Sequence, residues 1–216
     1  MKRNASVVIP AFNESGTIRQ VLEKLRDGAY ETLVVDDGSV DGTSDIAEGM
    51  GFRCIRLERN RGKGYACREG IRQASNEKIV LFDADNQFDP AQIPSMLEML
   101  EDSDIVIGER DMKNVPWQRR LSNSFAAWLV SISAGRRFRD VLCGFRAVRK
   151  QSFMGLGMEK DRYEFESEMV IKSVMKGFRV STLPVSVRYF RGASGISIGH
   201  SFMVTLFIIK QLIKPG

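Results

Sequence analysis

Two aspartates one residue apart, Asp83 and Asp85, are the residues of this sequence best suited to binding a charged ligand. They follow the apolar run 79–82, which predicts a buried strand of a parallel sheet. In open α/β sheets, ligands bind at the carboxyl ends of the strands. Alternation along the strand places both carboxylates on one side, where Mg²⁺ or Mn²⁺ would offset the cost of burying their charge. The motif alone is weak evidence, because Asp-Ala-Asp also suits a solvated turn.

Strand-like and helix-like segments alternate through the first half of the chain. Apolar runs predict strands at 7–10, 33–35, 52–57, 79–82 and 104–108, and helices are predicted at 17–26, at 41–50, up to residue 74 and at 90–101. This alternation predicts an α/β fold with a mainly parallel, doubly wound sheet flanked by helices. Asp36 and Asp37 end the second strand, so two acidic clusters are expected at the carboxyl ends of different strands.

The second half of the chain is less regular. Residues 144–148 suggest another strand, 165–175 a helix, and 178–189 an extended segment. No internal repeat, linker or low-complexity tract interrupts the 216 residues. We therefore expect a single domain spanning 1–216.

Charge and composition narrow the class of protein. The formal net charge of +5 favours an anionic partner, such as nucleotide phosphates, an anionic membrane surface or nucleic acid. His200 is the only histidine, which nearly excludes a serine or cysteine hydrolase with an imidazole base. Neither GxGxxG nor GxxxxGK[ST] occurs, so a metal would have to hold any phosphates. Three widely spaced cysteines and the absence of a signal-peptide pattern predict a reduced, cytosolic protein.

Two segments, near 117–139 and 202–213, have apolar stretches that are too short to span a bilayer. The first segment also carries five arginines: Arg119, Arg120, Arg136, Arg137 and Arg139. Apolar area with cationic flanks is typical of a helix that lies on an anionic membrane, where these arginines could gather an acceptor phosphate. A core helix with solvated ends would give much the same pattern, and we favour the membrane interpretation.

Several motifs together resemble the successive signatures of family 2 inverting glycosyltransferases. They are VVIPAFNE at 7–14, VVDDGSVDGT at 34–43 and DADNQ at 83–87. Further along, GFRA at 144–147 and ESEM at 166–169 resemble the branch that contains dolichyl-phosphate mannose synthases and related polyprenyl-phosphate sugar transferases. The resemblance covers nearly the whole chain, and it implies a GT-A fold and a GDP- or UDP-linked sugar as donor.

The resemblance also implies roles for individual residues. Pro10, Phe12 and Glu14 would line the nucleotide, and Val35 with Asp37 would meet its base or ribose. Asp83 and Asp85 would be the catalytic residues that hold Mg²⁺ or Mn²⁺ on the donor diphosphate, with Ala84 between them and Gln87 as a further ligand. The family places an arginine and a lysine on a late loop over the donor phosphates. Gly195 stands where that lysine is expected, so Arg188 or Arg191 would supply the charge.

The acceptor decides whether a general base is needed. The branch implies a polyprenyl phosphate at the cytoplasmic membrane face, with no nucleic-acid partner, and a phosphate oxygen is already ionised near neutral pH. A soluble transferase acting on a saccharide hydroxyl is the alternative, and it would need a carboxylate base. Asp111, Glu166 and Glu168 are the candidates, although the two glutamates also suit a solvated helix surface.

Two other classes of protein fit the sequence less well. A sugar nucleotidyltransferase would want a glycine-rich loop with arginine and lysine near the N-terminus, and residues 10–14 lack one. A catalytically dead nucleotide-binding module would have no need for the intact Asp37, Asp83 and Asp85.

Overall fold

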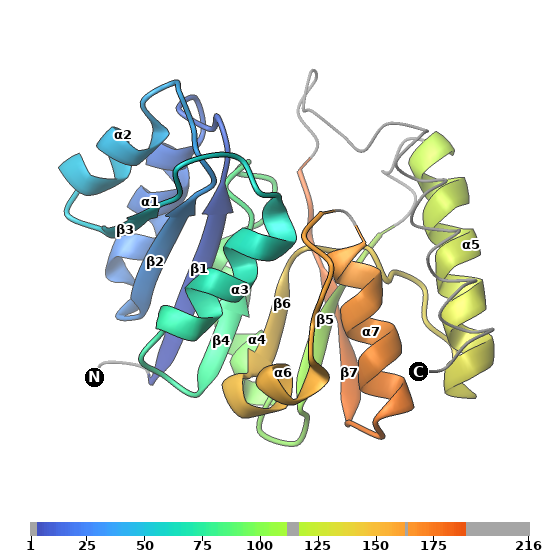
Figure 1. The fold of residues 1–216 in the computed structure, drawn as a ribbon. Helices are drawn as coiled ribbons and strands as arrows, with labels where there is room; N and C mark the ends of the chain where they lie inside the picture. The colour runs from blue at the N-terminus through green and yellow to red at the C-terminus, as the bar shows by residue number, and fades with distance from the viewer. Residues whose placement is uncertain (1–3, 112–116, 163, 189–216) are drawn as a thin grey trace.

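Seven strands form one sheet in the order β3-β2-β1-β4-β6-β5-β7 (Figure 1). This computed structural model describes residues 4–111, 117–162 and 164–188, without the side chains at 117–119, 122 and 133. The strands are β1 (Ala5–Ala11), β2 (Glu31–Asp36), β3 (Arg53–Arg56), β4 (Lys78–Leu81), β5 (Ile105–Arg110), β6 (Arg146–Arg149) and β7 (Val180–Val185). Neighbouring strands are parallel except at β6, which runs antiparallel to both β4 and β5.

Helices connect these strands. They are α1 (Ile18–Leu25), α2 (Thr43–Gly49), α3 (Lys63–Gln73), α4 (Ile93–Met99), α5 (Trp117–Ala134), α6 (Lys150–Leu156) and α7 (Phe165–Met175), with short 3-10 turns η1 (Arg26–Gly28) and η2 (Pro90–Gln92). The predicted mainly parallel α/β sheet is confirmed, and helix α6 is an addition that the sequence pattern did not reveal. The predicted apolar segment 202–213 lies outside the described residues.

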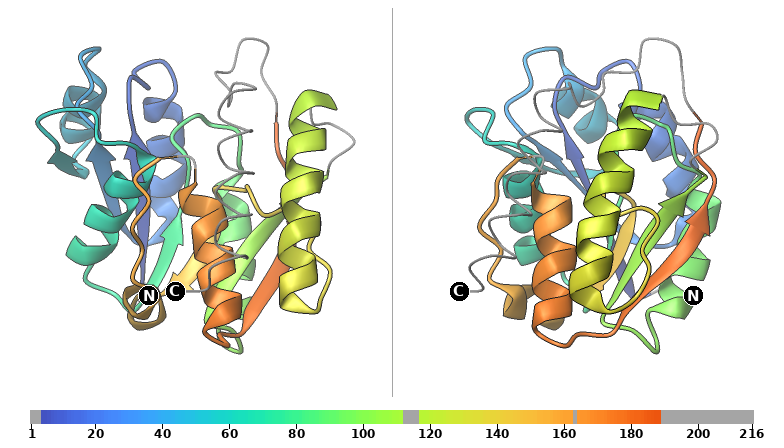
Figure 2. Two further views of the ribbon diagram at one scale, coloured as in Figure 1. Left: turned by 45° about the vertical axis from the view of Figure 1, so that its right-hand side comes forward. Right: turned by 90° about the vertical axis from the view of Figure 1, so that its right-hand side faces the viewer.

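The helices cover the two faces of the sheet and enclose two hydrophobic cores (Figures 1 and 2). Side chains of α3, α5, α6 and α7 pack against one face, where Val8, Leu33 and Leu81 point into the same core. Helices α1, α2 and α4 pack against the other face, toward which neighbouring residues such as Ile9 and Val34 point. Because the central strands are buried on both faces, their sequences are continuous apolar runs and do not alternate between apolar and polar residues, as is usual for parallel strands.

Hydrogen bonds from backbone amides to side-chain oxygens join the loop after β1 to the loop after β2. The Oγ atom of Ser39 accepts from the amide of Asn13 at 2.8 Å, and the Oγ1 atom of Thr43 accepts from the amide of Glu14 at 2.8 Å. Asp41 accepts from the amide of Ser15 at 2.9 Å and also from Thr43. Slight burial opposes ionisation of Asp41, but these hydrogen bonds outweigh it and lower its pKa to about 2. The sheet therefore presents a fixed rim at the carboxyl ends of β1 and β2.

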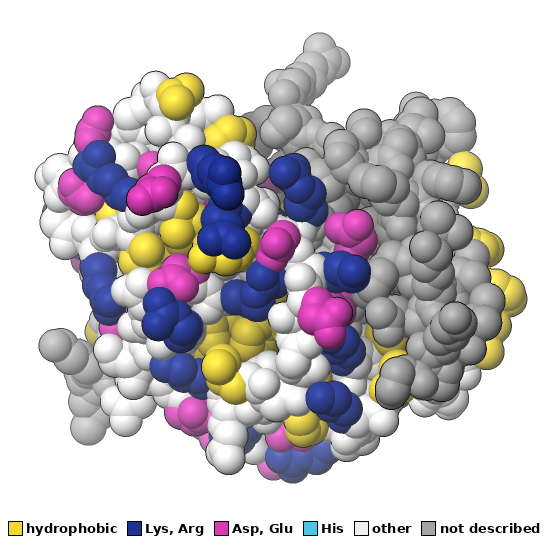
Figure 3. Space-filling view, in the orientation of Figure 1, with side chains coloured by type: hydrophobic (Ala, Val, Ile, Leu, Met, Phe, Trp, Pro, Cys, Tyr) yellow, Lys and Arg dark blue, Asp and Glu magenta, His cyan; other side chains and the backbone are white. Residues whose placement is uncertain are grey.

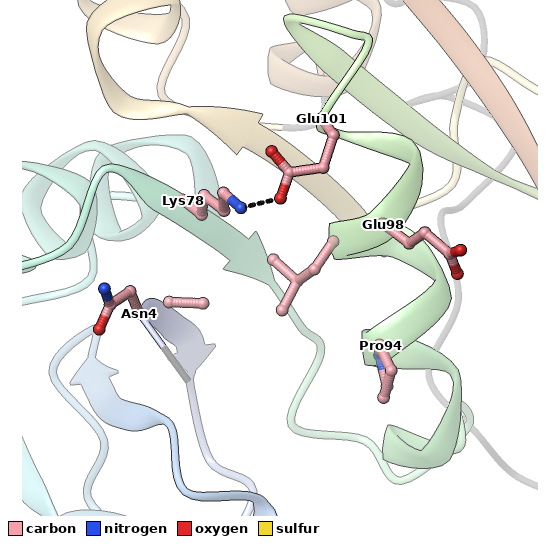
Figure 4. Close-up of a pocket in the computed structure, with 7 residues that line it drawn as sticks. Asn4, Lys78, Pro94, Glu98 and Glu101 are labelled. Carbon is pink, nitrogen blue, oxygen red and sulfur yellow. Dashed lines mark hydrogen bonds and ion pairs between the residues drawn. The ribbon is translucent and has the colours of Figure 1, made fainter. Parts of the chain in front are cut away.

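A cavity of about 300 Å³ lies at the opposite edge of the sheet (Figure 4). It is lined by Ala5 at the start of β1, by Lys78 at the start of β4 and by residues of α4. The Lys78 ammonium pairs with Glu101 across it. Because ligands of such sheets bind at the carboxyl ends, this cavity is not the candidate site.

Candidate active site

The two aspartates lie in a turn just beyond β4. This strand ends at Leu81, and residues 84–85 form the turn, so strand alternation does not place the two carboxylates as the sequence had suggested. The turn is held from both sides. Phe82 is buried and packs edge-on against Phe145, with ring centroids 5.2 Å apart. Asn86 adopts a left-handed conformation with φ of 60°, and its side chain hydrogen bonds to Gln20 and Lys24 of α1.

A lysine that the sequence analysis did not single out bridges two carboxylates at this turn. The Nζ atom of Lys63, the first residue of α3, lies 2.6 Å from Oδ1 of Asp83 and 3.0 Å from Oε1 of Glu166. Burial disfavours the charge on Lys63, but the attraction of Asp83 and Glu166 outweighs this and raises its pKa well above the ordinary value. The ammonium is therefore charged at neutral pH. The basic, glycine-containing loop 59–65 was the only sequence signal for it.

Gly144 leaves the space in which this ion pair sits. A Cβ atom on residue 144 would lie 2.4 Å from Oδ2 of Asp83 and 2.5 Å from Nζ of Lys63, so any larger residue would displace both groups. The adjacent Arg146 fixes this loop. Its fully buried guanidinium donates to the carbonyl oxygens of Val141, Cys143 and Glu166 at 2.7–2.8 Å. Arg146 thereby joins the Gly144 loop to the first turn of α7, which carries Glu166.

Asp85 is the most perturbed of the carboxylates near this turn. Burial first, and the charge of Asp83 second, raise its pKa to about 6. Its Oδ1 atom accepts a hydrogen bond from the amide of Gln87 at 3.1 Å. Glu14 belongs to the same group of acids, since burial raises its pKa, Thr17 opposes this by a hydrogen bond, and Asp83 adds to the rise. Crowded, buried carboxylates of this kind would be stabilised by a cation.

The arrangement fits a divalent cation that is shared with a substrate. Among the residues that the structure describes, no group of three or more His, Cys, Asp or Glu side chains forms a complete metal site. Magnesium sites often use only one or two carboxylates and take their remaining oxygens from water and from substrate phosphates. Asp83 and Asp85 can supply such a pair. Gln87 lies beside them and is largely buried, and its role as a further ligand stays a prediction.

The residues predicted to meet the nucleotide divide into two sets. Phe12 and Glu14 follow β1, and Asp37 follows β2. Phe12 is 44% exposed, whereas Asp37 is only 3% exposed. Val35 and Ala84 have side chains buried in the cores, and Pro10 is also buried. These three residues could touch a nucleotide only through their backbone, because their side chains pack inside the protein.

Asp37 holds the loop that leads to Lys63. Its two carboxylate oxygens accept hydrogen bonds from the amides of Arg61 at 2.7 Å and Gly62 at 2.8 Å. Burial raises the pKa of Asp37, and these two hydrogen bonds oppose the rise. From the other side, the carbonyl oxygen of Asp161 accepts from the amide of Gly64 at 2.7 Å. The start of α3 is therefore fixed in place, and Asp37 retains lone pairs with which it could also meet a ribose.

Replacing Asp37 by asparagine should lower both stability and affinity for nucleoside diphosphates. The new amide nitrogen cannot accept a hydrogen bond, so Arg61 or Gly62 loses its acceptor at a cost of about 1–3 kcal/mol. Melting curves and calorimetric titration with UDP and GDP would measure the two effects. The matched control is Asp45→Asn, which breaks an exposed ion pair with Arg56 and should change neither quantity appreciably. Unchanged stability and affinity in Asp37→Asn would contradict this role.

The three candidate general bases have different surroundings. Glu166 is already paired with Lys63. Glu168 is 1% exposed and has different partners. Its carboxylate accepts from the amides of Glu159 and Lys160 and pairs with Lys172 at 2.9 Å. Both glutamates are therefore partly or wholly buried rather than forming a solvated helix surface. Asp111 is exposed and directly follows β5 at the carboxyl edge of the sheet.

Of the late basic loop, Arg188 is described and Arg191 and Gly195 lie outside the described residues. The amide of Arg188 donates to the carbonyl oxygen of Gln87 at 2.8 Å, which places Arg188 beside the Asp83–Asp85 turn. Its side chain is exposed.

Helix α5 carries an apolar stripe on its outer side. Leu121, Phe125, Trp128 and Ile132 recur every three or four residues and are 63%, 43%, 56% and 61% exposed. The rings of Phe125 and Trp128 stack with centroids 5.8 Å apart. Figure 3 shows apolar side chains along the edge of the molecule that α5 forms, and Figure 2 shows α5 alongside α7. In the described part of the chain, no helix is long and apolar enough to cross a membrane.

The five arginines around α5 do not form one cluster. The helix begins at the carboxyl edge of the sheet and its 18 residues make it about 27 Å long (Figure 1). Arg120 is exposed near its start, and the side chain of Arg119 lies outside the described residues. Arg136, Arg137 and Arg139 follow its end, where Arg136 donates to the carbonyl of Val180 and Arg139 pairs with Glu109 at 3.5 Å. Val180 begins β7 at the far end of the sheet, whereas Glu109 lies near the end of β5, so Arg120 and Arg139 lie toward the edge that carries Asp83 and Arg136 does not. One acceptor phosphate could not meet all five arginines together, and the roles of the individual arginines stay a prediction.

The chain is similar to several relatives and solved structures. An uncharacterized protein of Methanocaldococcus jannaschii is 35% identical, over 96% of both chains. A dolichyl-phosphate hexose transferase of Haloferax volcanii is 29% identical, over 92% of both chains. The glucosyl-3-phosphoglycerate synthase of Mycobacterium tuberculosis, solved with Mn²⁺, UDP and phosphoglyceric acid, superposes with a TM-score of 0.76 at 22% identity, covering 98% of this chain and 78% of that one. This likeness confirms the predicted GT-A fold. Residues 6–183 match the model of glycosyl transferase family 2, and the chain belongs to that family.

Proposed function

We propose that this glycosyltransferase moves a sugar, with inversion, from a nucleoside-diphosphate donor to a polyprenyl phosphate at the cytoplasmic face of a membrane. The observation that carries the proposal is the exposed stripe on α5, which begins at the same edge of the sheet as Asp83 and Asp85. An enzyme whose acceptor is a membrane lipid needs its site beside a surface that contacts the membrane. The relative named as a dolichyl-phosphate hexose transferase supports the acceptor class.

The donor would bind over the rim formed by the loops after β1 and β2. Phe12 offers an exposed ring for a base, and Asp37 would accept from a ribose hydroxyl only through the small part of its carboxylate that is exposed. Asp83 and Asp85 would hold a divalent cation that, when bound, stabilises the charge on the departing nucleoside diphosphate. Mn²⁺ and UDP in the solved neighbour support this pairing. The exposed side chain of Arg188, next to this turn, can add positive charge at the phosphates.

A phosphate acceptor agrees with the pairing of the carboxylates. The acceptor oxygen is ionised near neutral pH, so it can attack without losing a proton to the protein. Glu166 is neutralised by Lys63, and Glu168 is tied to the loop 159–160 and to Lys172. Neither glutamate is placed to act as a free base. A saccharide acceptor remains the second candidate, because Asp111 follows β5 at the correct edge of the sheet.

One experiment compares the two acceptors directly. The protein is incubated with Mn²⁺ and labelled UDP- or GDP-sugars, either with vesicles containing a polyprenyl phosphate or with soluble saccharides. We expect label to enter the organic phase only with the lipid phosphate, and Asp111→Asn to retain this activity. Equal transfer to a soluble saccharide, with loss of turnover in Asp111→Asn, would replace the proposal by the second candidate. The donor can be chosen beforehand as the nucleotide sugar that raises the melting temperature most.

A further inference from the structure

The ammonium of Lys63 already occupies the position of a cation at the Asp83 carboxylate. It lies 2.6 Å from Oδ1 of Asp83, a normal distance for a charge-assisted hydrogen bond. A divalent ion bound by Asp83 and Asp85 would bring two further positive charges to the same carboxylate. Two cations that share one carboxylate repel each other, and the repulsion is strong in a partly buried site. Metal binding and the Lys63–Asp83 contact therefore oppose one another.

The Lys63 ammonium has a second carboxylate, that of Glu166, with which it can stay paired. Oε1 of Glu166 lies 3.0 Å from the same Nζ atom, and the Glu166 side chain is only 10% exposed. The backbone of Glu166 is fixed, because its carbonyl oxygen accepts from the buried guanidinium of Arg146 at 2.7 Å. Glu166 is therefore a largely buried anion on a fixed backbone, and it can retain the ammonium after Asp83 has released it.

The lysine is anchored by its backbone and free to move at its tip. Its neighbours Gly62 and Gly64 are held by Asp37 and by the carbonyl of Asp161, whereas about a third of the Lys63 side chain, 32%, is exposed. A small rotation of a flexible four-carbon chain is enough to break one of two contacts made by the same atom. The carboxylates of Asp83, Asp85 and Glu166 carry up to three negative charges. These can balance the single ammonium and a divalent ion together.

We propose that Lys63 is a resident cation that a divalent metal displaces from Asp83, and that Glu166 retains the ammonium at the edge of the site for the donor diphosphate. The inference rests on the proposed function, since it takes Asp83 and Asp85 as metal ligands. Glu166 is then a positioning residue that acts through Lys63. Metal binds more weakly than it would without the lysine, and the released ammonium strengthens binding of the metal–diphosphate complex. The two effects have opposite signs.

Titration with Mn²⁺ alone, followed by calorimetry or by the electron paramagnetic resonance signal of free Mn²⁺, tests the first effect. We expect Lys63→Met to bind Mn²⁺ at least tenfold more tightly than the wild type and to gain more in melting temperature from Mn²⁺. Lys78→Met is the matched control. Lys78 begins β4, at the end of the strand away from Asp83, and its ammonium pairs with Glu101. Its removal should not change Mn²⁺ affinity.

Titration of the Mn²⁺-loaded proteins with UDP and GDP tests the second effect. Lys63→Met should bind the preferred diphosphate at least tenfold more weakly, although it binds the metal more tightly. Glu166→Gln should weaken Mn²⁺ binding several-fold in the presence of Lys63, and much less in the Lys63→Met background, because the glutamate acts through the lysine. This dependence is a readout that a purely structural role of Glu166 would not produce.

The possible outcomes separate this inference from the proposed function. If the wild type binds Mn²⁺ and Lys63→Met binds it equally or less tightly, the displacement is wrong and the metal site stands. If neither protein binds Mn²⁺, with or without UDP and GDP, both the inference and the metal dependence fail. If Lys63→Met loses its native melting transition, Glu166→Gln, which keeps the lysine, decides the question. Unchanged Mn²⁺ affinity in Glu166→Gln would then overturn the inference.

Discussion

Replacing Asp85 by asparagine should lower the rate of sugar transfer by about 10²–10³-fold and leave the protein at least as stable as the wild type. The loss of activity is expected because the buried carboxylate is half of the proposed cation site, and a single electrostatic group of this kind contributes on the order of 10²–10³-fold to rate. Stability should not fall, since burial and the charge of Asp83 raise the pKa of Asp85 to about 6. Because the pKa in the folded protein lies above the ordinary value, the ionised form destabilises the metal-free fold at neutral pH. Asparagine removes that charge.

Asp83→Asn should lose activity to a similar extent, with a different effect on the fold. Its carboxylate neutralises Lys63, so among the described residues the substitution leaves Glu166 as the one ion-pair partner of the ammonium and should lower the melting temperature. Steady-state transfer and melting curves with and without Mn²⁺ measure both effects. Asp89→Asn is the matched control, since Asp89 caps the turn η2 in the same loop and asparagine caps equally well. Near wild-type turnover in Asp85→Asn would end the assignment of this carboxylate.

Local patterns in the sequence were sufficient to predict most of the fold. Strand β1 is buried throughout, and its run of Val7, Val8 and Ile9 is the pattern of a parallel strand with helices on both sides. Helix α1 buries Ile18, Val21, Leu22 and Leu25, the spacing of an amphipathic helix. Such patterns depend on residues that are close together along the chain. The antiparallel direction of β6 depends instead on its pairing with β4 and β5, which are distant in the sequence, so it could not be predicted in this way.

The same distinction explains what was missed at the site. Asp83 and Asp85 could be found because they follow an apolar run, whereas Lys63, the partner of Asp83, begins helix α3, 20 residues earlier in the chain. Glu166 and Glu168 are two residues apart on one helix, and residues at that spacing do not share a face. One therefore reaches Lys63 and the other the loop 159–160. No pattern in the sequence distinguishes their partners, because both glutamates occur in the same motif.

Arg146 shows how burial can contradict a reasonable expectation from residue type. An arginine in a strand of four residues would ordinarily lie at the surface, but this side chain is fully buried. Burial lowers the pKa of its guanidinium, and the nearby charge of Glu166 opposes that change. Three backbone carbonyls satisfy its donors. The motif that resembled a family signature is thus partly a scaffold, which holds Gly144 and Glu166 around the Lys63–Asp83 pair.

Replacing Phe125 and Trp128 together by serine should largely prevent binding to membranes and leave donor binding unchanged. Both rings project from the outer side of α5, and burial of a large apolar side chain contributes roughly 1.5–3 kcal/mol. Each ring is already about half buried, so we expect a loss of about tenfold or more in vesicle affinity for each. Flotation with anionic vesicles measures the change. Met175→Ser is the matched control, because Met175 is 44% exposed at the end of α7 and lies outside the stripe.

The arginines at the two ends of α5 should contribute in a different way. Each basic side chain near an anionic leaflet contributes about 1 kcal/mol, and salt screens this attraction within about 10 Å at 0.1 M. Arg120→Gln and Arg137→Gln should therefore weaken vesicle binding at low salt and have little effect at high salt, whereas the loss caused by the two serines should persist at both. Arg120 lies near the start of α5, at the carboxyl edge of the sheet, and its replacement should also raise the apparent KM for the lipid phosphate. Replacement of Arg137, beyond the far end of α5, should not change this KM. If the wild-type protein does not float with the vesicles at low salt, the proposal that α5 binds a membrane is wrong. The exposed stripe would then have another partner.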